Sequence, residues 1–162
     1  MHLIKIITFK ASNLLCKAMT IFLTDDDSDD CLLFSEALRE SHSGVTLNVT
    51  TDGVRLMEML HGAPLMTPMV LFLDLNMPRK NGFECLEEIR KSPNLKDIPV
   101  IIFSTSSNTD IIDRTYRQGA NYFISKPNSF VLLKKAIGLI LSFDPTQLQS
   151  KPLREQYVIN VA

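Results

Sequence analysis

The sequence predicts an α/β protein whose parallel sheet is covered by helices on both faces. Short, apolar segments alternate with amphipathic ones, and this β-then-α pattern occurs five times within the 162 residues. Wholly apolar strands are typical of a parallel sheet that is buried on both sides. The composition, with 45% hydrophobic and 22% charged residues, is that of an ordinary globular domain.

The five predicted strands are short, and polar residues follow them. The first, third and fourth are nearly continuous apolar runs, and the second alternates apolar and polar side chains, which also indicates a strand. We expect the strands at Met19–Thr24, Val45–Thr50, Met69–Leu73, Val100–Phe103 and Tyr122–Ser125.

Each predicted strand is followed by a segment whose apolar side chains recur at helical spacing. Ser28 or Asp29 can cap the first helix, and Gly119 ends the fourth. We expect the helices at about 29–40, 54–61, 83–91, 109–118 and 129–143.

Lysines interrupt the first 18 residues, which therefore resemble neither a membrane span nor a signal peptide. We divide the chain into an N-terminal extension (1–18), a domain (19–143) and a C-terminal tail (144–162).

Charge and cysteine content narrow the function classes. Lys and Arg total 17 against 18 for Asp and Glu, so the chain lacks the basic excess of a general nucleic-acid-binding protein. Cys16, Cys31 and Cys85 are odd in number and widely spaced, which indicates reduced thiols and a cytoplasmic location. The three histidines are equally scattered, so no zinc site is expected.

Side chains of related chemistry follow four of the predicted strands. Ligands of open α/β sheets bind outside the carboxyl ends of the strands, so we expect these side chains to share one site. They are Asp25, Asp26 and Asp27 after the first strand, Asp74 after the third, Ser104 after the fourth and Lys126 after the fifth.

Converging carboxylates repel one another unless a cation is present. Carboxylate oxygens with room for water suit Mg²⁺, and Mg²⁺ beside an exposed carboxylate and a lysine is suited to phosphoryl transfer. A carboxylate can itself be the nucleophile and form an acyl phosphate. The sequence therefore predicts a magnesium-dependent site for phosphoryl chemistry.

Four segments make Met19–Phe143 similar to the receiver domains of two-component response regulators. In the family's order and spacing, they are IFLTDDDSDD, VLFLDLNMPRKNGFE, IPVIIFSTSS and GANYFISKP. The resemblance implies a flavodoxin-like, doubly wound (βα)5 sheet with strand order 2-1-3-4-5. It extends to single-domain, chemotaxis-receiver-like members that serve phytochrome-type and other hybrid kinases.

The resemblance also implies a role for each matching acidic residue. Asp74 would accept the phosphoryl group. Asp25, Asp26 and Asp74, together with the backbone carbonyl of Asn76, would hold Mg²⁺.

Two residues that follow the last two strands, and one within the last strand, would respond to phosphorylation. Lys126 would pair first with the Asp74 carboxylate and then with the phosphoryl group, and Ser104 would donate a hydrogen bond to it. Phe123 would be the aromatic switch that turns inward when Ser104 moves. The Lys126–Pro127 peptide bond would be cis, as in similar proteins.

The implied function is that of a phosphoacceptor response regulator in phosphorelay signal transduction. A sensor histidine kinase or phosphorelay protein would phosphorylate Asp74, and the changed conformation would signal to a downstream protein. Such a chain is a signalling protein, not an enzyme, because it catalyses only its own phosphorylation and dephosphorylation. We expect no DNA-binding domain and no membrane attachment. The sequence leaves open whether the chain forms a homodimer. Two interpretations fit Tyr157, Val158, Ile159 and Val161: they extend a contact between two copies, or they belong to an unstructured tail.

Alternative interpretations of the function use some of the same residues. Asp25 and Asp27 form the DxD of a haloacid-dehalogenase-like phosphatase, but Asp74 would then be unexplained. A degenerate receiver would keep the fold and act as a binding module without phosphorylation. A calcium loop starting at Asp25 is rejected, because Asp30 stands where such a loop needs glycine.

Overall fold

The computed structural model describes residues 19–62 and 68–161, in which strands and helices alternate as predicted. The strands are β1 (Thr20–Thr24), β2 (Thr46–Thr50), β3 (Met69–Leu73), β4 (Val100–Ser104) and β5 (Tyr122–Ser125). The helices are α2 (Ser28–Ser41), α3 (Gly53–Gly62), α4 (Gly82–Lys91), α5 (Thr109–Arg117), α6 (Phe130–Ser142) and α7 (Pro145–Gln149), and a 3₁₀ turn, η1, spans Arg154–Gln156. The predicted N-terminal extension, 1–18, lies outside the described residues.

The five strands form one parallel sheet in the order β2-β1-β3-β4-β5, which confirms the predicted order. Thr24 at the end of β1 lies beside Thr50 of β2 and beside Leu73 of β3. At the other end of the strand order, Ser104 of β4 lies beside Ser125 of β5. Because all strands run in the same direction, the residues that follow them lie along one edge of the sheet.

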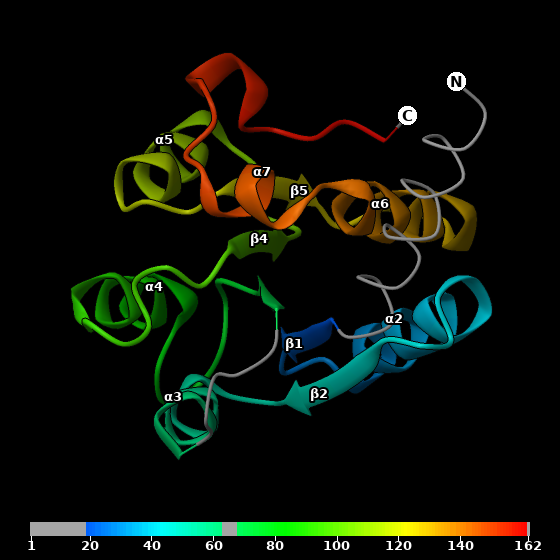
Figure 1. The fold of residues 1–162 in the computed structure, drawn as a ribbon, viewed down its shortest axis with the longest axis horizontal. Helices are drawn as coiled ribbons and strands as arrows, with labels where there is room; N and C mark the ends of the chain where they lie inside the picture. Colours follow the sequence, from blue (N-terminus) through cyan, green and yellow to red (C-terminus); the bar gives the residue numbers. More distant parts are fainter. Residues whose placement is uncertain (1–18, 63–67, 162) are drawn as a thin grey trace, which may run out of the picture.

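Helices cover both faces of this sheet (Figure 1). Helices α2 and α6 lie on one face, and α3, α4 and α5 lie on the other. The side chains of β3 and β4 are almost all buried, because both of their sides face helices. On the α2 face, the rings of Phe34, Phe72 and Phe103 pack edge to face with centroids 4.9 to 6.0 Å apart. Among the described helices, none has the length and apolar character needed to cross a bilayer.

Helix α2 begins with a different cap from the one that the sequence predicted. The N-cap is Asp27, not Ser28 or Asp29, and its carboxylate accepts the backbone N–H groups of Asp29 (2.9 Å) and Asp30 (3.2 Å). A carboxylate here satisfies N–H groups that no helical carbonyl can reach and interacts favourably with the helix dipole. The cap fixes the first turn of α2 beside the end of β1.

The C-terminal segment, residues 144–161, packs along the outer side of β5 and is not an unstructured tail (Figure 1). The N–H of Phe123 donates to the carbonyl of Tyr157 at 2.9 Å, and the N–H of Ile159 donates to the carbonyl of Phe123 at 2.8 Å. The Tyr157 side chain is fully buried, and its hydroxyl donates to that of Thr115 in α5 at 2.8 Å. This segment therefore pairs backbone groups that β5 would otherwise expose at the edge of the sheet.

Candidate functional site

Backbone hydrogen bonds that continue past the strand ends place three of the predicted residues at the carboxyl edge. The N–H of Asp25 donates to the last carbonyl of β2 at 3.1 Å, and that of Asp74 donates to the last carbonyl of β1 at 2.9 Å. The N–H of Lys126 donates to the last carbonyl of β4 at 3.0 Å. The sheet itself therefore fixes the backbones from which these side chains project.

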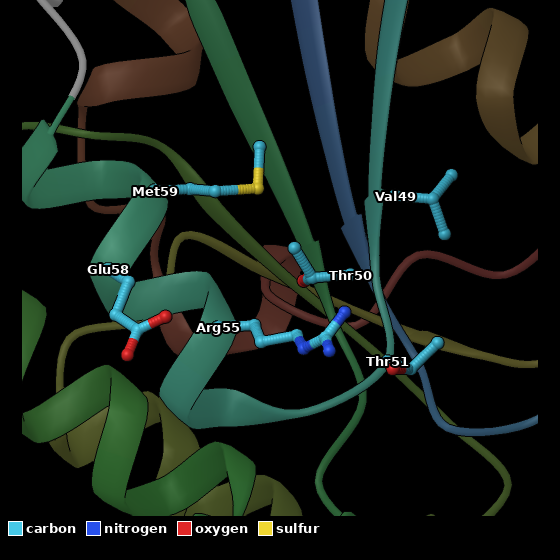
Figure 2. Close-up of a pocket in the computed structure, with 6 residues that line it drawn as sticks. All are labelled: Val49, Thr50, Thr51, Arg55, Glu58 and Met59. Carbon is cyan, nitrogen blue, oxygen red and sulfur yellow. The ribbon is translucent and has the colours of Figure 1, made fainter.

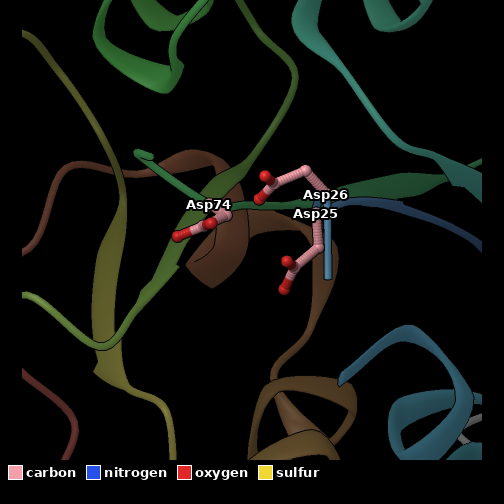
Figure 3. Close-up of side chains that lie close together, drawn as sticks. All are labelled: Asp25, Asp26 and Asp74. Carbon is pink, nitrogen blue, oxygen red and sulfur yellow. The ribbon is translucent and has the colours of Figure 1, made fainter. Parts of the chain in front are cut away.

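Three carboxylates form an acidic cluster at this edge (Figure 3). One oxygen from each of Asp25, Asp26 and Asp74 lies within 4.8 Å of the other two. Asp25 and Asp74 are buried, whereas Asp26 is exposed. Carboxylate oxygens with room for water are the ligands that Mg²⁺ prefers, so the cluster fits a divalent cation.

The protonation behaviour of the buried carboxylates also fits a cation. Burial and the nearby charge of Asp25 raise the pKa of Asp74 to about 6, although the ammonium group of Lys126 acts in the opposite direction. Burial likewise raises the pKa of Asp25. Its Oδ2 atom is buried and receives no hydrogen bond of good geometry from the described residues. A positive ion beside these oxygens would favour their ionised form.

Lys126 reaches into the acidic cluster from the end of β5. Its Nζ atom lies 2.7 Å from Asp25 Oδ2, 2.8 Å from Asp30 Oδ2 and 3.8 Å from Asp74 Oδ2. Burial alone lowers the pKa of Lys126, but the ion pairs with Asp25 and Asp30 outweigh burial, so the pKa is raised. The ammonium group is therefore charged at neutral pH and balances part of the negative charge of the acidic cluster.

Asp30 is a site residue that the sequence analysis missed. It lies in the first turn of α2, 96 positions from Lys126 in the chain, and the packing of the fold brings the two side chains together. The acidic run DDDSDD was visible in the sequence. An acid in the first turn of a helix is favourable without any tertiary partner, so the pattern alone does not single out Asp30.

Ser104 and Asn76 lie at the same edge and are linked through Ser106. Ser104 is fully buried, and its Oγ accepts the N–H of Ser106 at 3.2 Å. The exposed side-chain amide of Asn76 donates to the hydroxyl of Ser106 at 3.2 Å. The loop after β4 is thereby connected to the loop after Asp74.

Two features near β5 bear on what the resemblance implied. Phe123 is fully buried, with its ring centroid 6.2 Å from that of Tyr157 in the C-terminal segment, and its role as a switch stays a prediction. The Lys126–Pro127 peptide bond is trans and not cis. The trans form is the lower-energy isomer of an X–Pro bond.

Gly82 allows helix α4 to begin against the loop that follows Asp74. Its N–H donates to the carbonyl of Leu75 at 3.0 Å, and the side chain of Asn81 caps the helix. A Cβ atom at position 82 would lie 2.2 Å from the carbonyl oxygen of Asp74 and 2.8 Å from the Cα of Leu75. Any side chain there would therefore displace the backbone that carries the Asp74 carboxylate.

A separate pocket beside strand β2 contains none of the predicted site residues. Its lining is Val49, Thr50, Thr51, Arg55, Glu58 and Met59 (Figure 2). Arg55 and Glu58 contribute one charge of each sign, in contrast to the three converging carboxylates of the acidic cluster. We therefore place the functional site at the carboxyl edge of the sheet.

Comparison with known proteins identifies the family. The response regulator receiver domain matches residues 21–138, which is more than half of the chain. The chain belongs to the response regulator receiver family. As a receiver, it is a signalling protein of a two-component system, in which receivers interact with histidine kinases or phosphorelay proteins.

The receiver is similar to the response regulator Rcp1 of Synechocystis sp., with 34% identity over 129 residues that cover 76% of this chain and 86% of Rcp1. The crystal structure of the phosphorylated cyanobacterial phytochrome response regulator RcpA matches with a TM-score of 0.68 and 35% identity, covering 75% of this chain and 89% of RcpA. The Mn²⁺-bound form of Rcp1 matches with a TM-score of 0.66 and 34% identity, over 76% and 92% of the two chains. These similarities confirm the predicted family and fold.

Proposed function

We propose that this receiver accepts a phosphoryl group on Asp74 from a sensor histidine kinase or a phosphorelay protein. An oxygen of Asp74 attacks the phosphorus while the bond between phosphorus and the donor nitrogen breaks. The products are an acyl phosphate on Asp74 and a neutral imidazole on the donor, whose ring takes up one proton from water as the bond to phosphorus breaks. The receiver modifies only itself in this step, so we assign it a signalling role rather than an enzymatic one.

One observation carries this proposal: a buried carboxylate, Asp74, lies beside two further carboxylates and an ammonium group. Asp74 Oδ1 accepts the N–H of Leu75 at 2.8 Å, which leaves Oδ2 to face Lys126 and an incoming phosphoryl group. Asp25 is engaged by Lys126 through Oδ2 and by the N–H of Asp27 through Oδ1. Asp74 is therefore the buried carboxylate best suited to act as the nucleophile.

Mg²⁺ is the cofactor that we propose, with Asp25, Asp26, Asp74 and the backbone carbonyl of Asn76 as its protein ligands. Bound there, it would neutralise the carboxylates and the oxygens of the transferring phosphoryl group. The relative Rcp1 has a Mn²⁺-bound form, which supports the proposal that this chain also binds a divalent cation. Lys126, whose Nζ lies 3.8 Å from Asp74 Oδ2, would add a second cationic group beside the phosphoryl group.

The response to phosphorylation would begin with the side chains that touch the new phosphoryl oxygens. Lys126 would pair with them, and the hydroxyl of Ser104 would donate to one of them. A movement of Ser104 would pull on Ser106 and change the space available to Phe123. The surface of α5, β5 and α6 would then differ between the two states, and a downstream protein would bind one of them better.

The similarity to Rcp1 and RcpA supports a phytochrome-type or other hybrid kinase as the partner of this chain. We place this exchange in the cytoplasm, where the free thiols of Cys31 and Cys85 stay reduced. The receiver domain would comprise residues 19–143, with the C-terminal segment as a packed addition to it.

Phosphorylation by a small donor tests the proposal. Acetyl phosphate with Mg²⁺ should add one phosphoryl group per chain, read by intact-mass spectrometry, and EDTA should prevent the addition. Asp74→Asn should stay unmodified, and Asp26→Asn should be modified at least about 10-fold more slowly because a cation ligand is lost. A wild-type chain that is never modified would favour the binding-module alternative. A modification that persists in Asp74→Asn would favour phosphatase-like chemistry at Asp25.

A further inference from the structure

The ammonium group of Lys126 is shared with a carboxylate outside the acidic cluster, that of Asp30. Lys126 Nζ lies 2.7 Å from Asp25 Oδ2 and 2.8 Å from Asp30 Oδ2, but 3.8 Å from Asp74 Oδ2. The Lys126 side chain is only 10% exposed, whereas that of Asp30 is 36% exposed. A partly exposed acid on α2 thus reaches inward to a lysine that the resemblance assigned to Asp74.

The first turn of α2 explains why Asp30 is the residue that reaches Lys126. The Asp27 carboxylate is occupied by the cap, where it accepts the N–H groups of Asp29 and Asp30. The cap orders the backbone of Asp30 and leaves its carboxylate available to Lys126. Asp29 lies on the same turn but is exposed, and within the described residues its carboxylate forms no ion pair.

We propose that Asp30 is a positioning residue, which in the unphosphorylated receiver competes for the ammonium group that a phosphoryl group on Asp74 must recruit. The proposal rests on the phosphoacceptor function proposed above. A phosphoryl group adds negative charge at Asp74, so Lys126 must shift its interaction from Asp25 and Asp30 towards Asp74. The ion pair between Asp30 and Lys126 is then strongest in the unphosphorylated state, so it opposes the phosphorylation of Asp74.

The competition has a definite direction. An interaction made only before phosphorylation stabilises the unphosphorylated state, so its removal favours the phosphorylated one. The negative charge of Asp30 also repels an incoming anionic phosphoryl donor, which acts in the same direction. If Asp30 served only the dipole of α2, Asp29 would be equivalent to it.

The test compares Asp30→Asn with Asp29→Asn, because both changes remove one negative charge from the same helical turn. We expect acetyl phosphate with Mg²⁺ to phosphorylate Asp30→Asn about 3- to 10-fold faster than wild type, and Asp29→Asn within about 2-fold of wild type. Asp30→Glu, which restores the charge on a longer side chain, should return the rate towards that of wild type. A rate for Asp30→Asn equal to or below that of Asp29→Asn would overturn the proposal.

A second measurement reads the contact without phosphorylation. In metal-free protein, the ¹⁵Nζ signal of Lys126 in heteronuclear NMR should shift in Asp30→Asn and stay unchanged in Asp29→Asn. An unchanged signal in both variants would show that Asp30 does not hold the ammonium group. A wild-type chain that takes no phosphoryl group would refute the proposed function while this NMR comparison still decides the contact.

Discussion

Gly82 sets how closely α4 approaches the backbone that carries the Asp74 carboxylate. A Cβ atom at this position would meet the backbone of Asp74 at 2.2 Å, and backbone cannot yield as a flexible side chain can. We predict that Gly82→Ala lowers the free energy of unfolding by about 1–3 kcal/mol. Urea unfolding followed by circular dichroism measures this change.

Gly62 supplies the matched control, because a Cβ atom there would meet none of the described residues within 4 Å. Gly62→Ala should leave the unfolding free energy unchanged or raise it by up to about 1 kcal/mol, since alanine favours helices. Equal effects of the two substitutions would show that the close contact at Gly82 does not constrain the loop.

Single residues show where sequence reasoning succeeds and where it stops. Asp25, Asp74 and Lys126 could be found because each follows an apolar strand, and parallel strands end at one edge. Asp30 could not be found, because its role depends on the distance between α2 and the end of β5. A capping or solvated acid and an ion-paired acid look alike in the first turn of a helix.

At the scale of elements, the C-terminal segment behaves as part of the core on the α5 face. Tyr157 packs its ring against Tyr116 and Phe123, and its hydroxyl donates to Thr115. The segment also pairs with the backbone of β5. It therefore covers the strand that carries the predicted switch residue and that directly precedes the lysine of the site.

We predict that Tyr157→Ala lowers the free energy of unfolding by about 3–5 kcal/mol, because it leaves a cavity beside β5. Tyr157→Phe should cost only about 1 kcal/mol, since the hydroxyl of Thr115 keeps its bonds to backbone carbonyls of α5. Leu153→Ala, at a side chain that is 61% exposed, is the control and should change stability by less than about 0.5 kcal/mol. If Tyr157→Ala were as mild as Leu153→Ala, the segment would not belong to the core.

The sheet and its helices could be predicted because burial on both faces leaves a strong apolar pattern in the sequence. The C-terminal segment could not, because a short run such as Tyr157–Ile159 has the same appearance in a loose tail and in a packed strand. Its placement depends on the open edge of β5, which only the assembled sheet defines.

At the scale of the whole molecule, the acidic cluster links stability to pH. Asp74 has its pKa raised from 3.8 to about 6, so the folded state binds its proton more tightly than the unfolded state does. The folded state therefore loses stability as the pH rises from about 4 to 6, and the loss persists above pH 6. A shift of about two units corresponds to about 3 kcal/mol.

We predict that Asp74→Asn, which cannot ionise, gains up to about 3 kcal/mol of stability relative to wild type between pH 4 and pH 7.5. The comparison is made by urea unfolding at both pH values in EDTA, so that no divalent cation compensates the charge. A stability difference that is the same at pH 4 and pH 7.5 would contradict the raised pKa of Asp74.

The position of the phosphoryl group in the modified chain tests the central claim most directly. Borohydride reduces an acyl phosphate to an alcohol, so treatment after acetyl phosphate marks the modified aspartate for peptide mass spectrometry. We predict that the reduced residue is Asp74 and that its formation requires Mg²⁺. Reduction at Asp25 or Asp26, with Asp74 intact, would contradict the account.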